Sequence, residues 1–360
     1  MTNPHPSTQA DILRAIDRLL KTKGILPLRS GVRLLKKQVS SNPSSALNQD
    51  PTDQRSDVPR IPLNHFLSEL DQIEQAKTLV RARYYLDRLK RSLVEVNTRS
   101  VNDINLNRWK EYENILTDSL WLMDRRDGSG GHSAWYWGNF VPQIPQQLML
   151  RYTKAGEWVL DPFAGSGTTL LESRRLGRNC IGIELQASVA RKVRQRLKLR
   201  NAEDQPTITG LEVGDSKSLN VRQILKSYGT RSVQLVILHP PYHNIIQFSK
   251  NRNDLSNTGS ATEFTSQFGR VIDNVQPLLD SGRTLALVIG DKYERGEWIP
   301  LGFMAMNEVL KRKFKLKSIV IKNFEETVGK RSQKELWRVR ALAGGFYVFK
   351  HEYSFIFQKE

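Results

Sequence analysis

The sequence predicts an α/β fold in which a doubly wound, mostly parallel sheet is covered by helices on both faces and preceded by a helical extension. From Val159 onward, short apolar runs alternate with amphipathic segments of helical period. The first of these runs leads into a glycine-rich turn and then a helix, a unit that commonly binds ligands at the edge of such a sheet.

Residues 159–184, VLDPFAGSGTTLLESRRLGRNCIGIE, predict a strand, a turn, a helix and a second strand. Gly165 and Gly167 leave the backbone of the turn bare, so a ligand can approach it closely. Glu184 follows the turn by about 20 residues, the separation at which an acid at the tip of the second strand binds ribose hydroxyls. The stretch therefore predicts a cradle for a nucleotide-like ligand.

Three kinds of cofactor compete for this turn. A phosphate-binding loop of ATPases needs a lysine after its last glycine, but Thr168 and Thr169 follow Gly167. A dinucleotide-binding turn needs a third glycine, which is missing, and Asp161 would repel its pyrophosphate. An acid at this position instead suits a ligand that carries a positive charge.

A second motif, HPPY, follows the apolar run Leu235 to Leu238, so it is expected at the carboxyl end of a central strand beside the glycine turn. Its two prolines stiffen the turn and remove two backbone donors, which leaves carbonyl oxygens as acceptors. Tyr242 supplies a flat face on which a flipped base can stack. A metal site at His239 and His243 is not predicted, because no nearby acid or cysteine completes a ligand set.

DPFAGSGTT at 161–169 and HPPY at 239–242 together resemble the motifs of S-adenosylmethionine-dependent DNA methyltransferases that modify N4 of cytosine or N6 of adenine. The resemblance covers roughly Trp135 to Phe357. It implies a seven-stranded sheet of the class I methyltransferase (Rossmann-like) type, with S-adenosylmethionine as cofactor. The residues it implies for cofactor binding are Phe140, Asp161, Phe163, Gly165, Gly167, Thr168, Glu184 and Asp215.

The resemblance also implies that the catalytic residues are His239, Pro240, Pro241 and Tyr242. In the family the first residue of this motif is Asp, Asn or Ser, and it takes a hydrogen bond from the target amino group. His239 departs from that pattern, and only a neutral imidazole nitrogen can accept such a bond.

The predicted function is site-specific methylation of DNA at a base amino group. N4 of cytosine is favoured, because a Pro-Pro-Tyr motif without an intervening recognition domain resembles the cytosine enzymes. Three alternatives stay open: N6-adenine methylation of DNA, base methylation of RNA, and a non-catalytic nucleic-acid-binding relative in which His239 has disabled the site.

The chain carries 55 Lys plus Arg against 37 Asp plus Glu, a net charge of +18, which favours a polyanionic partner. Double-stranded DNA is the expected partner, together with a cognate restriction endonuclease; no membrane contact and no metal are expected. The residues expected to contact DNA lie in two basic stretches, 243–260 and 327–340: Lys250, Arg252, Lys330, Arg331, Lys334, Arg338 and Arg340. A basic helix in the first hundred residues is a third candidate.

The expected domains are a helical accessory region, 1–130, with a flexible linker at about 39–60, and a catalytic domain, 131–360. Helices are expected at 8–23, from Asn64 to Tyr84 and at 105–127. No apolar stretch of about 18 residues and no secretion signal is present, so we expect a cytoplasmic protein. Further helices are expected at 186–200, 216–227, 262–279 and 300–311, and further strands at 208–213, 235–238, 284–291, 318–323 and 346–357.

Overall fold

The computed structural model describes residues 9–41, 61–123, 125–133, 135–199, 202, 204–323 and 334–360. The chain forms two compact units. The first comprises Met1–Ser100 and Ile104–Glu113, and the second comprises Val101–Asp103 and Asn114–Glu360.

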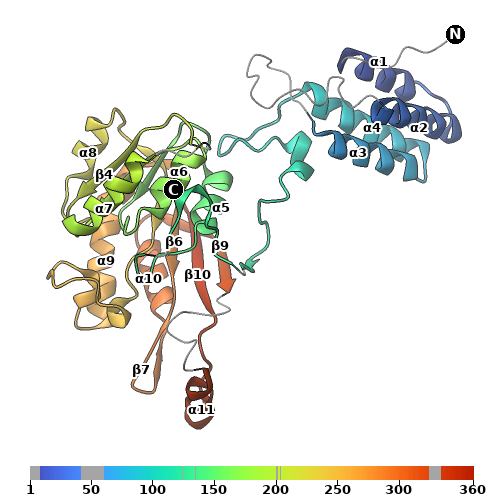
Figure 1. Cartoon of the computed structure of the whole chain (residues 1–360). Coiled ribbons are helices and arrows are strands. Elements are labelled where there is room, and N and C mark those ends of the chain that lie inside the picture. Colours follow the sequence, from blue (N-terminus) through green and yellow to red (C-terminus); the bar gives the residue numbers. More distant parts are fainter. Residues whose placement is uncertain are drawn as a thin grey trace. The chain divides into compact units, whose positions relative to one another are not determined.

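The first unit is a small helical domain with its own core (Figure 1). Each helix buries one face of apolar residues at helical spacing, such as Ile12, Ile16 and Leu19 on the first helix. The faces meet in a cluster that includes Leu28, Phe66, Leu70, Leu86 and Leu89. The elements are α1 (Gln9–Leu20), α2 (Ile25–Ser41), α3 (Leu63–Gln75), α4 (Leu79–Val94) and the 3₁₀ helix η1 (Leu106–Glu111).

The helix expected from Asn64 to Tyr84 is wrong, because the chain breaks it into α3 and α4. Thr78 starts α4 as an N-cap, and its hydroxyl accepts a hydrogen bond from Arg81 N at 3.2 Å. The break leaves Val80 and Tyr84 outside the core, 80% and 50% exposed. The expected cap of that helix is also wrong, since Pro62 precedes its first residue and Asn64 lies inside α3.

Two further expectations for this region change. Residues 105–127 are not one helix, since they hold only η1 and the short strand β1 (Leu120–Trp121). The expected linker at 39–60 begins inside α2, which continues to Ser41, and residues 42–60 lie outside the described ranges.

The second unit contains one large sheet with the strand order β1-β9-β10-β6-β5-β2-β3-β4. Strand β10 runs antiparallel to β6 and β9, whereas the other paired strands are parallel, so the mostly parallel sheet is confirmed. The described part has eight strands rather than seven, because β1 adds to the edge at β9. The strands after β1 are β2 (Trp158–Asp161), β3 (Asn179–Glu184), β4 (Thr209–Val213), β5 (Val233–Leu238), β6 (Leu279–Ile289), β9 (Phe314–Asn323) and β10 (His351–Lys359).

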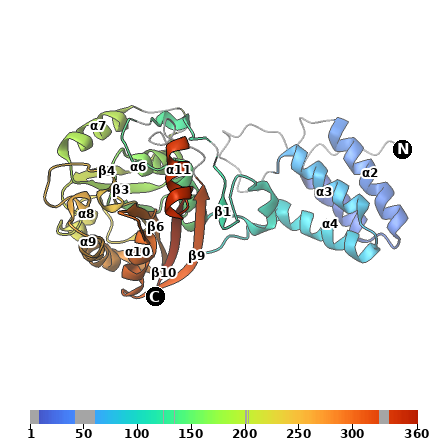
Figure 2. The same cartoon turned by 90° about the horizontal axis from the view of Figure 1, so that it is seen from below.

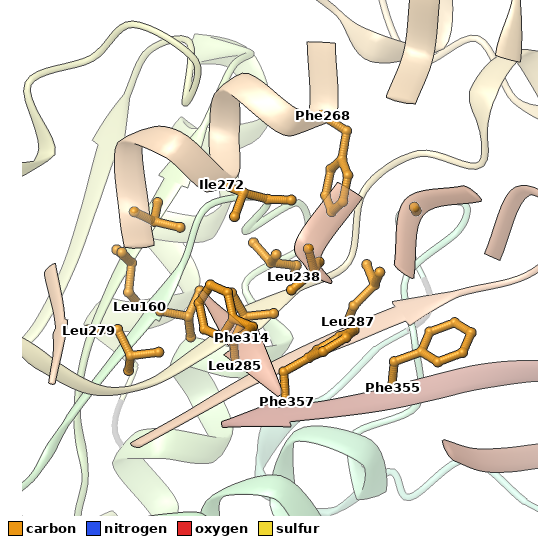
Figure 3. Close-up of a cluster of buried hydrophobic side chains, with 14 of the residues drawn as sticks. Leu160, Leu238, Phe268, Ile272, Leu279, Leu285, Leu287, Phe314, Phe355 and Phe357 are labelled. Atoms are coloured by element: carbon orange, nitrogen blue, oxygen red, sulfur yellow. The ribbon is translucent and has the colours of Figure 1, made fainter. Parts of the chain in front are cut away.

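Helices cover both faces of this sheet, as predicted (Figures 1 and 2). Successive strand residues point to opposite faces, so Leu160 and Leu238 enter one core while Val159 and Ile237 enter the other. Figure 3 shows Phe268 and Ile272 extending from a covering helix towards Leu238 of the sheet. The helices are α5 (Gln143–Tyr152), α6 (Thr168–Arg175) and α7 (Ala187–Lys198) on one face, and α8 (Val221–Ser227), α9 (Ala261–Val275) and α10 (Leu301–Leu310) on the other.

The carboxyl edge of the parallel strands carries two additions that the sequence did not predict. A hairpin of β7 (Lys292–Glu294) and β8 (Glu297–Ile299) follows β6, and helix α11 (Lys334–Gly344) precedes β10. Aromatic pairs join the hairpin to the segment between α11 and β10, because the ring of Tyr293 stacks on Phe346 with 4.1 Å between centroids and the rings of Trp298 and Phe349 are 4.2 Å apart. Both extend beyond the same end of the sheet (Figure 1). Among the described helices, none has the length and apolar character needed to cross a bilayer.

Candidate active site

The candidate site lies where the order of the sheet reverses, at the carboxyl ends of β2 and β5. These strands are paired neighbours, yet the chain continues from β2 to β3 on one side and from β5 to β6 on the other. Such a reversal opens a crevice at the strand ends, where α/β sheets bind ligands. Asp161 ends β2 and His239 directly follows β5, so the two predicted motifs are brought together.

The residues 161–168, which we call the glycine loop, turn sharply from β2 into α6. Gly165 and Gly167 have φ angles of +48° and +78°, a region that favours glycine. A side chain at Gly167 would also lie 2.5 Å from Cγ1 of Val193 on α7. Gly167 is therefore needed for close packing of the loop against α7, and not only for access by a ligand.

Two buried carboxyl groups flank this loop. Asp161 accepts a hydrogen bond from Phe163 N at 2.9 Å, and burial raises the pKa of its carboxyl to about 6. Glu184 accepts from Gly165 N at 2.9 Å through Oε2 and from Gln186 N at 2.8 Å through Oε1. Burial raises the pKa of Glu184 to about 7. Each oxygen of Glu184 keeps a lone pair, so the carboxylate can still accept ligand hydroxyls.

The other residues predicted for cofactor binding surround the same loop. Phe163 stacks on Phe268 at 6.4 Å, and the buried Thr168 hydroxyl lies 3.0 Å from Ser166 Oγ. Asp215 follows β4, whose end lies beside that of β3. Its half-buried carboxylate accepts a hydrogen bond from Lys217 N at 3.0 Å and lies 3.7 Å from Lys217 Nζ, so Asp215 caps a turn and keeps capacity to accept from a ligand.

The segment before α5 packs against the glycine loop. Tyr136 lies over Gly165, since a side chain there would come within 3.3 Å of its ring. Asn139 Nδ2 donates to Ser166 Oγ at 3.1 Å. Phe140 is buried, and its ring stacks on His239 with 4.6 Å between centroids. The predicted cofactor segment thus contacts both the glycine loop and the HPPY motif.

The HPPY motif forms a rigid turn with hydrogen-bonded side chains. His239 Nε2 lies 3.3 Å from Tyr242 Oη, and that hydroxyl donates to Glu352 Oε2 of β10 at 2.7 Å. Burial lowers the pKa of His239 to about 4, so the ring is neutral at physiological pH. Burial also raises the pKa of Tyr242, and the negative charge of Glu352 adds to this effect. The imidazole is therefore in the form that can accept a hydrogen bond.

His243 does not share a site with His239. Its ring donates through Nε2 to Thr258 O at 2.8 Å, and its Nδ1 faces Lys292 Nζ at 3.2 Å. No group of three or more His, Cys, Asp or Glu side chains that could hold a metal is found in the described ranges.

Four of the residues predicted to contact DNA are exposed in the described part of the chain. Lys250 and Arg252 are exposed, as are Arg338 and Arg340 on α11, where the Arg340 guanidinium lies 5.5 Å from the Trp337 ring centroid. Lys330 and Arg331 lie outside the described residues, and Lys334 begins α11.

The basic helix considered as a third DNA contact is α4, and much of its charge is neutralised within the first unit. Arg88 pairs with Glu69, and Lys90 pairs with Asp17 at 2.6 Å. Arg83 donates to the carbonyl oxygen of Thr22 at 2.7 Å.

Sequence reasoning missed four residues of this site: Tyr136, Asn139, Lys322 and Glu352. Lys322 and Glu352 are almost fully buried and lie 3.7 Å apart on β9 and β10. The sequence did hold a signal for this pair, since each residue is a charge within an otherwise apolar strand. Such charges are rarely buried unless they are paired. Tyr136 and Asn139 gave no signal beyond their place in an aromatic segment.

Comparison with known proteins finds a family model that matches the part of the chain with the glycine loop. Residues 65–195, which contain the glycine loop and Glu184, match the N6_N4_Mtase model, described as DNA methylase. This part of the chain is similar to DNA methylases. S-adenosylmethionine is the cofactor that the resemblance implied, and it carries both a positive charge and ribose hydroxyls. The buried acids and the bare backbone of the glycine loop fit a cationic ligand with ribose hydroxyls.

Curated relatives match the chain over short segments. The type II methyltransferase M2.DpnII of Streptococcus pneumoniae is 37% identical over 91 residues, which cover 24% of this chain and 34% of the relative. M.MjaII of Methanocaldococcus jannaschii is 42% identical over 50 residues, covering 14% of this chain and 9% of the relative. M.SmaI of Serratia marcescens is 34% identical over 82 residues, covering 23% and 27%. The matched segments thus span about a third or less of these relatives.

Solved structures are less similar. TrmN from Thermus thermophilus has 16% sequence identity and a TM-score of 0.38, over 62% of this chain and 50% of that chain. The glycopeptide N-methyltransferase MtfA, solved with S-adenosylmethionine, has 12% identity and a TM-score of 0.39, over 66% of this chain and all of that chain. These values are too low to bear on activity.

Proposed function

We propose that this protein is a DNA methyltransferase that transfers a methyl group from S-adenosylmethionine to an exocyclic amino group of a base in a specific duplex sequence. One observation carries the proposal. The glycine loop with its two buried acids and the HPPY motif stand at the ends of the paired strands β2 and β5, and Phe140 contacts His239 between them. A cofactor in the crevice and a base at HPPY would therefore be neighbours.

The cofactor would lie along the ends of β2, β3 and β4. Asp161 would pair with the cationic amino group of the methionine part, Glu184 would accept hydrogen bonds from the ribose hydroxyls, and Asp215 would accept one from the adenine amino group. When bound, S-adenosylmethionine supplies a methyl group on a positively charged sulfur. Phe140 and Phe163 shield the site from water, which strengthens these charged contacts.

The target base would be flipped out of the duplex and held at the HPPY turn. Tyr242 supplies the stacking face, and the carbonyl of Pro240 and the neutral ring of His239 accept hydrogen bonds from the amino group. These bonds direct the nitrogen lone pair towards the methyl group, and alignment alone supplies a large part of the rate enhancement. The amino nitrogen loses a proton as it gains the methyl, and the neutral ring of His239 would accept that proton and pass it to solvent.

N4 of cytosine is the proposed target atom. The support is the order of the motifs, with three strand-helix units between the glycine loop and HPPY, which leaves no room for an inserted recognition domain. Sequence recognition then falls to the loop 243–260 and to the additions at the carboxyl edge, where Lys250, Arg252, Arg338 and Arg340 are exposed. A cognate restriction endonuclease that cuts the same sequence is a partner we propose from the family alone.

The test is expression in a host that lacks DNA methylation, followed by digestion of its DNA to nucleosides and mass spectrometry. We expect N4-methylcytosine with the parent protein and none with His239→Ala or Tyr242→Ala. Lys226→Ala, at the opposite edge of the sheet, is the matched control and should retain full modification. N6-methyladenine alone would replace the proposed atom but keep the enzyme class.

A methyl-transfer assay on purified plasmid DNA and on total RNA separates the remaining alternatives. Transfer to RNA alone would make this an RNA methyltransferase. Binding of S-adenosylmethionine without transfer to either nucleic acid would make it a non-catalytic relative.

A further inference from the structure

Four side chains form a continuous polar row behind the HPPY turn: His239, Tyr242, Glu352 and Lys322. Tyr242 Oη lies 3.3 Å from His239 Nε2 and 2.7 Å from Glu352 Oε2, and Glu352 Oε1 lies 3.7 Å from Lys322 Nζ. Glu352 and Lys322 are 4% and 5% exposed and sit on β10 and β9, outside both sequence motifs.

The protons of this row can be assigned from its ends. The Lys322 ammonium can only donate hydrogen bonds, and the Glu352 carboxylate can only accept them. Burial raises the pKa of Glu352 and lowers that of Lys322, while the charge of each partner acts in the opposite direction on the other and favours the ion pair. The single hydroxyl proton of Tyr242 therefore goes to Glu352. The phenol oxygen is left as an acceptor, and His239 Nε2 must be the nitrogen that carries hydrogen.

The other ring nitrogen is left as an acceptor. No hydrogen bond to His239 Nδ1 is formed by the residues that the structure describes, and Nδ1 is not among the buried atoms that lack a partner. An unprotonated Nδ1 has one in-plane lone pair, which is what an amino group requires from the first residue of this motif. The opposite tautomer would present an N–H to the amino group and repel it.

We propose that Glu352 and Lys322 are positioning residues that hold His239 in the Nε2–H tautomer, so that Nδ1 accepts the hydrogen bond from the target amino group. This rests on the proposed function for the role of Nδ1, but the tautomer itself is a property of the protein alone. It explains how a histidine can occupy the place of Asp, Asn or Ser: the row supplies a fixed acceptor that a free imidazole lacks.

The first experiment measures the tautomer without any substrate. Protein labelled with ¹⁵N at its six histidines is recorded by long-range ¹H–¹⁵N correlation at about pH 8, and His239→Asn identifies the signals by their loss. We expect the Nε2–H pattern for His239. The Nδ1–H pattern in the parent protein would overturn the proposal, whatever the activity.

The second experiment uses Glu352→Gln to reverse the direction of the hydrogen bonds along the row. Lys322 will hold the carbonyl oxygen of the new amide, so its NH₂ will donate to Tyr242, and the phenol proton will turn to His239 Nε2. We expect the Nδ1–H pattern and a fall in kcat of about 10–100-fold, with the KM for S-adenosylmethionine unchanged.

Adding Tyr242→Phe to Glu352→Gln supplies the rescue. Without the phenol nothing forces the proton onto Nδ1, so the double variant should return towards a mixture of tautomers and exceed Glu352→Gln in kcat. A double variant no better than the single one, with folding intact by circular dichroism, would mean that Glu352 acts only structurally. Should Glu352→Gln fail to fold, Tyr242→Phe alone tests the row, since it must lose the pure Nε2–H pattern. If the tautomers behave as expected but no base is methylated, the proposed function fails while the row stands.

Discussion

The ring of Phe140 lies nearly parallel to the imidazole of His239, with 4.6 Å between centroids and 22° between planes. The contact joins the segment before α5 to the HPPY turn and covers one face of the imidazole. Burial of this kind disfavours the charged ring and holds the pKa of His239 at about 4.

Phe140→Leu should therefore raise the pKa of His239 towards its ordinary value of about 6.5, because the smaller side chain admits water to the ring. Histidine NMR titration measures the change. Phe303→Leu is the control, since Phe303 packs on Tyr353 and Phe355. A pKa that stays near 4 in Phe140→Leu would show that other groups keep the ring neutral.

Cofactor binding should strengthen as pH rises from about 5 to 8. Burial raises the pKa of Asp161 to about 6 and of Glu184 to about 7, and the ligand's ammonium and hydroxyls favour the ionised forms. Binding near pH 6.5 should thus release protons, which calorimetry detects by comparing buffers of different ionisation enthalpy. Glu184→Gln should flatten the upper part of the pH dependence; net proton uptake would contradict the assignment of these acids.

The same two acids affect the stability of the protein without cofactor in the opposite direction. A carboxyl whose pKa is higher in the folded than in the unfolded state stabilises the fold below the unfolded pKa, and this contribution is lost as pH rises through the folded value. Asp161→Asn and Glu184→Gln should therefore lessen the loss of thermal stability between about pH 4 and 7. An unchanged pH profile of the melting temperature in both variants would contradict the raised pKa values.

Gly167→Ala should destabilise the protein more than Gly156→Ala, although the two glycines have φ angles of +78° and +77°. Both substitutions incur backbone strain of about 1–2 kcal/mol. Only at Gly167 does the added methyl group also clash, with Val193, and such overpacking lowers the free energy of unfolding by about a further 1–3 kcal/mol. Urea unfolding compares the two, and Val193→Ala in the Gly167→Ala background should recover part of the difference. Equal losses would show that α7 moves aside without cost.

Replacing Arg338 and Arg340 together by Ala should weaken duplex binding and reduce the salt dependence of the affinity. Each lost phosphate contact lowers the slope of log K against log salt by about 1. Fluorescence anisotropy with a labelled DNA duplex, recorded over a range of salt concentrations, measures the affinity and its salt dependence. Lys226→Ala with Arg231→Ala, exposed at the opposite edge of the sheet, removes the same charge and should leave the slope nearly unchanged. Equal slopes for the two double variants would remove α11 from the DNA interface.

The sequence predicts the sheet well, apart from the edge strand β1, because its longer strands repeat apolar residues with period two or are buried on both faces. The position of Asp161 and His239 at neighbouring strand ends follows from that pattern and from the order of elements. Expected boundaries fail where local hydrogen bonds compete with periodicity: the carbonyl of Asp215 accepts from Ser218 N and Leu219 N, and Asn220 then caps α8, which begins at Val221 rather than at 216. Similarly α9 ends at Val275, and β10 begins at His351 rather than at 346.

The contacts that join the two motifs could not be predicted, because they depend on pairing between distant strands. Tyr242 and Glu352 are 110 residues apart, and only the insertion of β10 between β6 and β9 brings them together. The break between α3 and α4 was not predicted, because a single threonine N-cap is a weak signal beside an apolar stripe that continues at helical spacing.

Strand β10 is made after every strand it touches, yet it lies between β6 and β9 and provides the carboxylate behind Tyr242. During synthesis, the two neighbours must therefore remain apart, or separate again, until residues 351–359 leave the ribosome. A nascent chain can form the glycine loop early, while the HPPY turn gains its last hydrogen-bond partner only then. Cofactor capture and base capture would thus mature at different times, and incomplete chains would hold a cradle without a working acceptor.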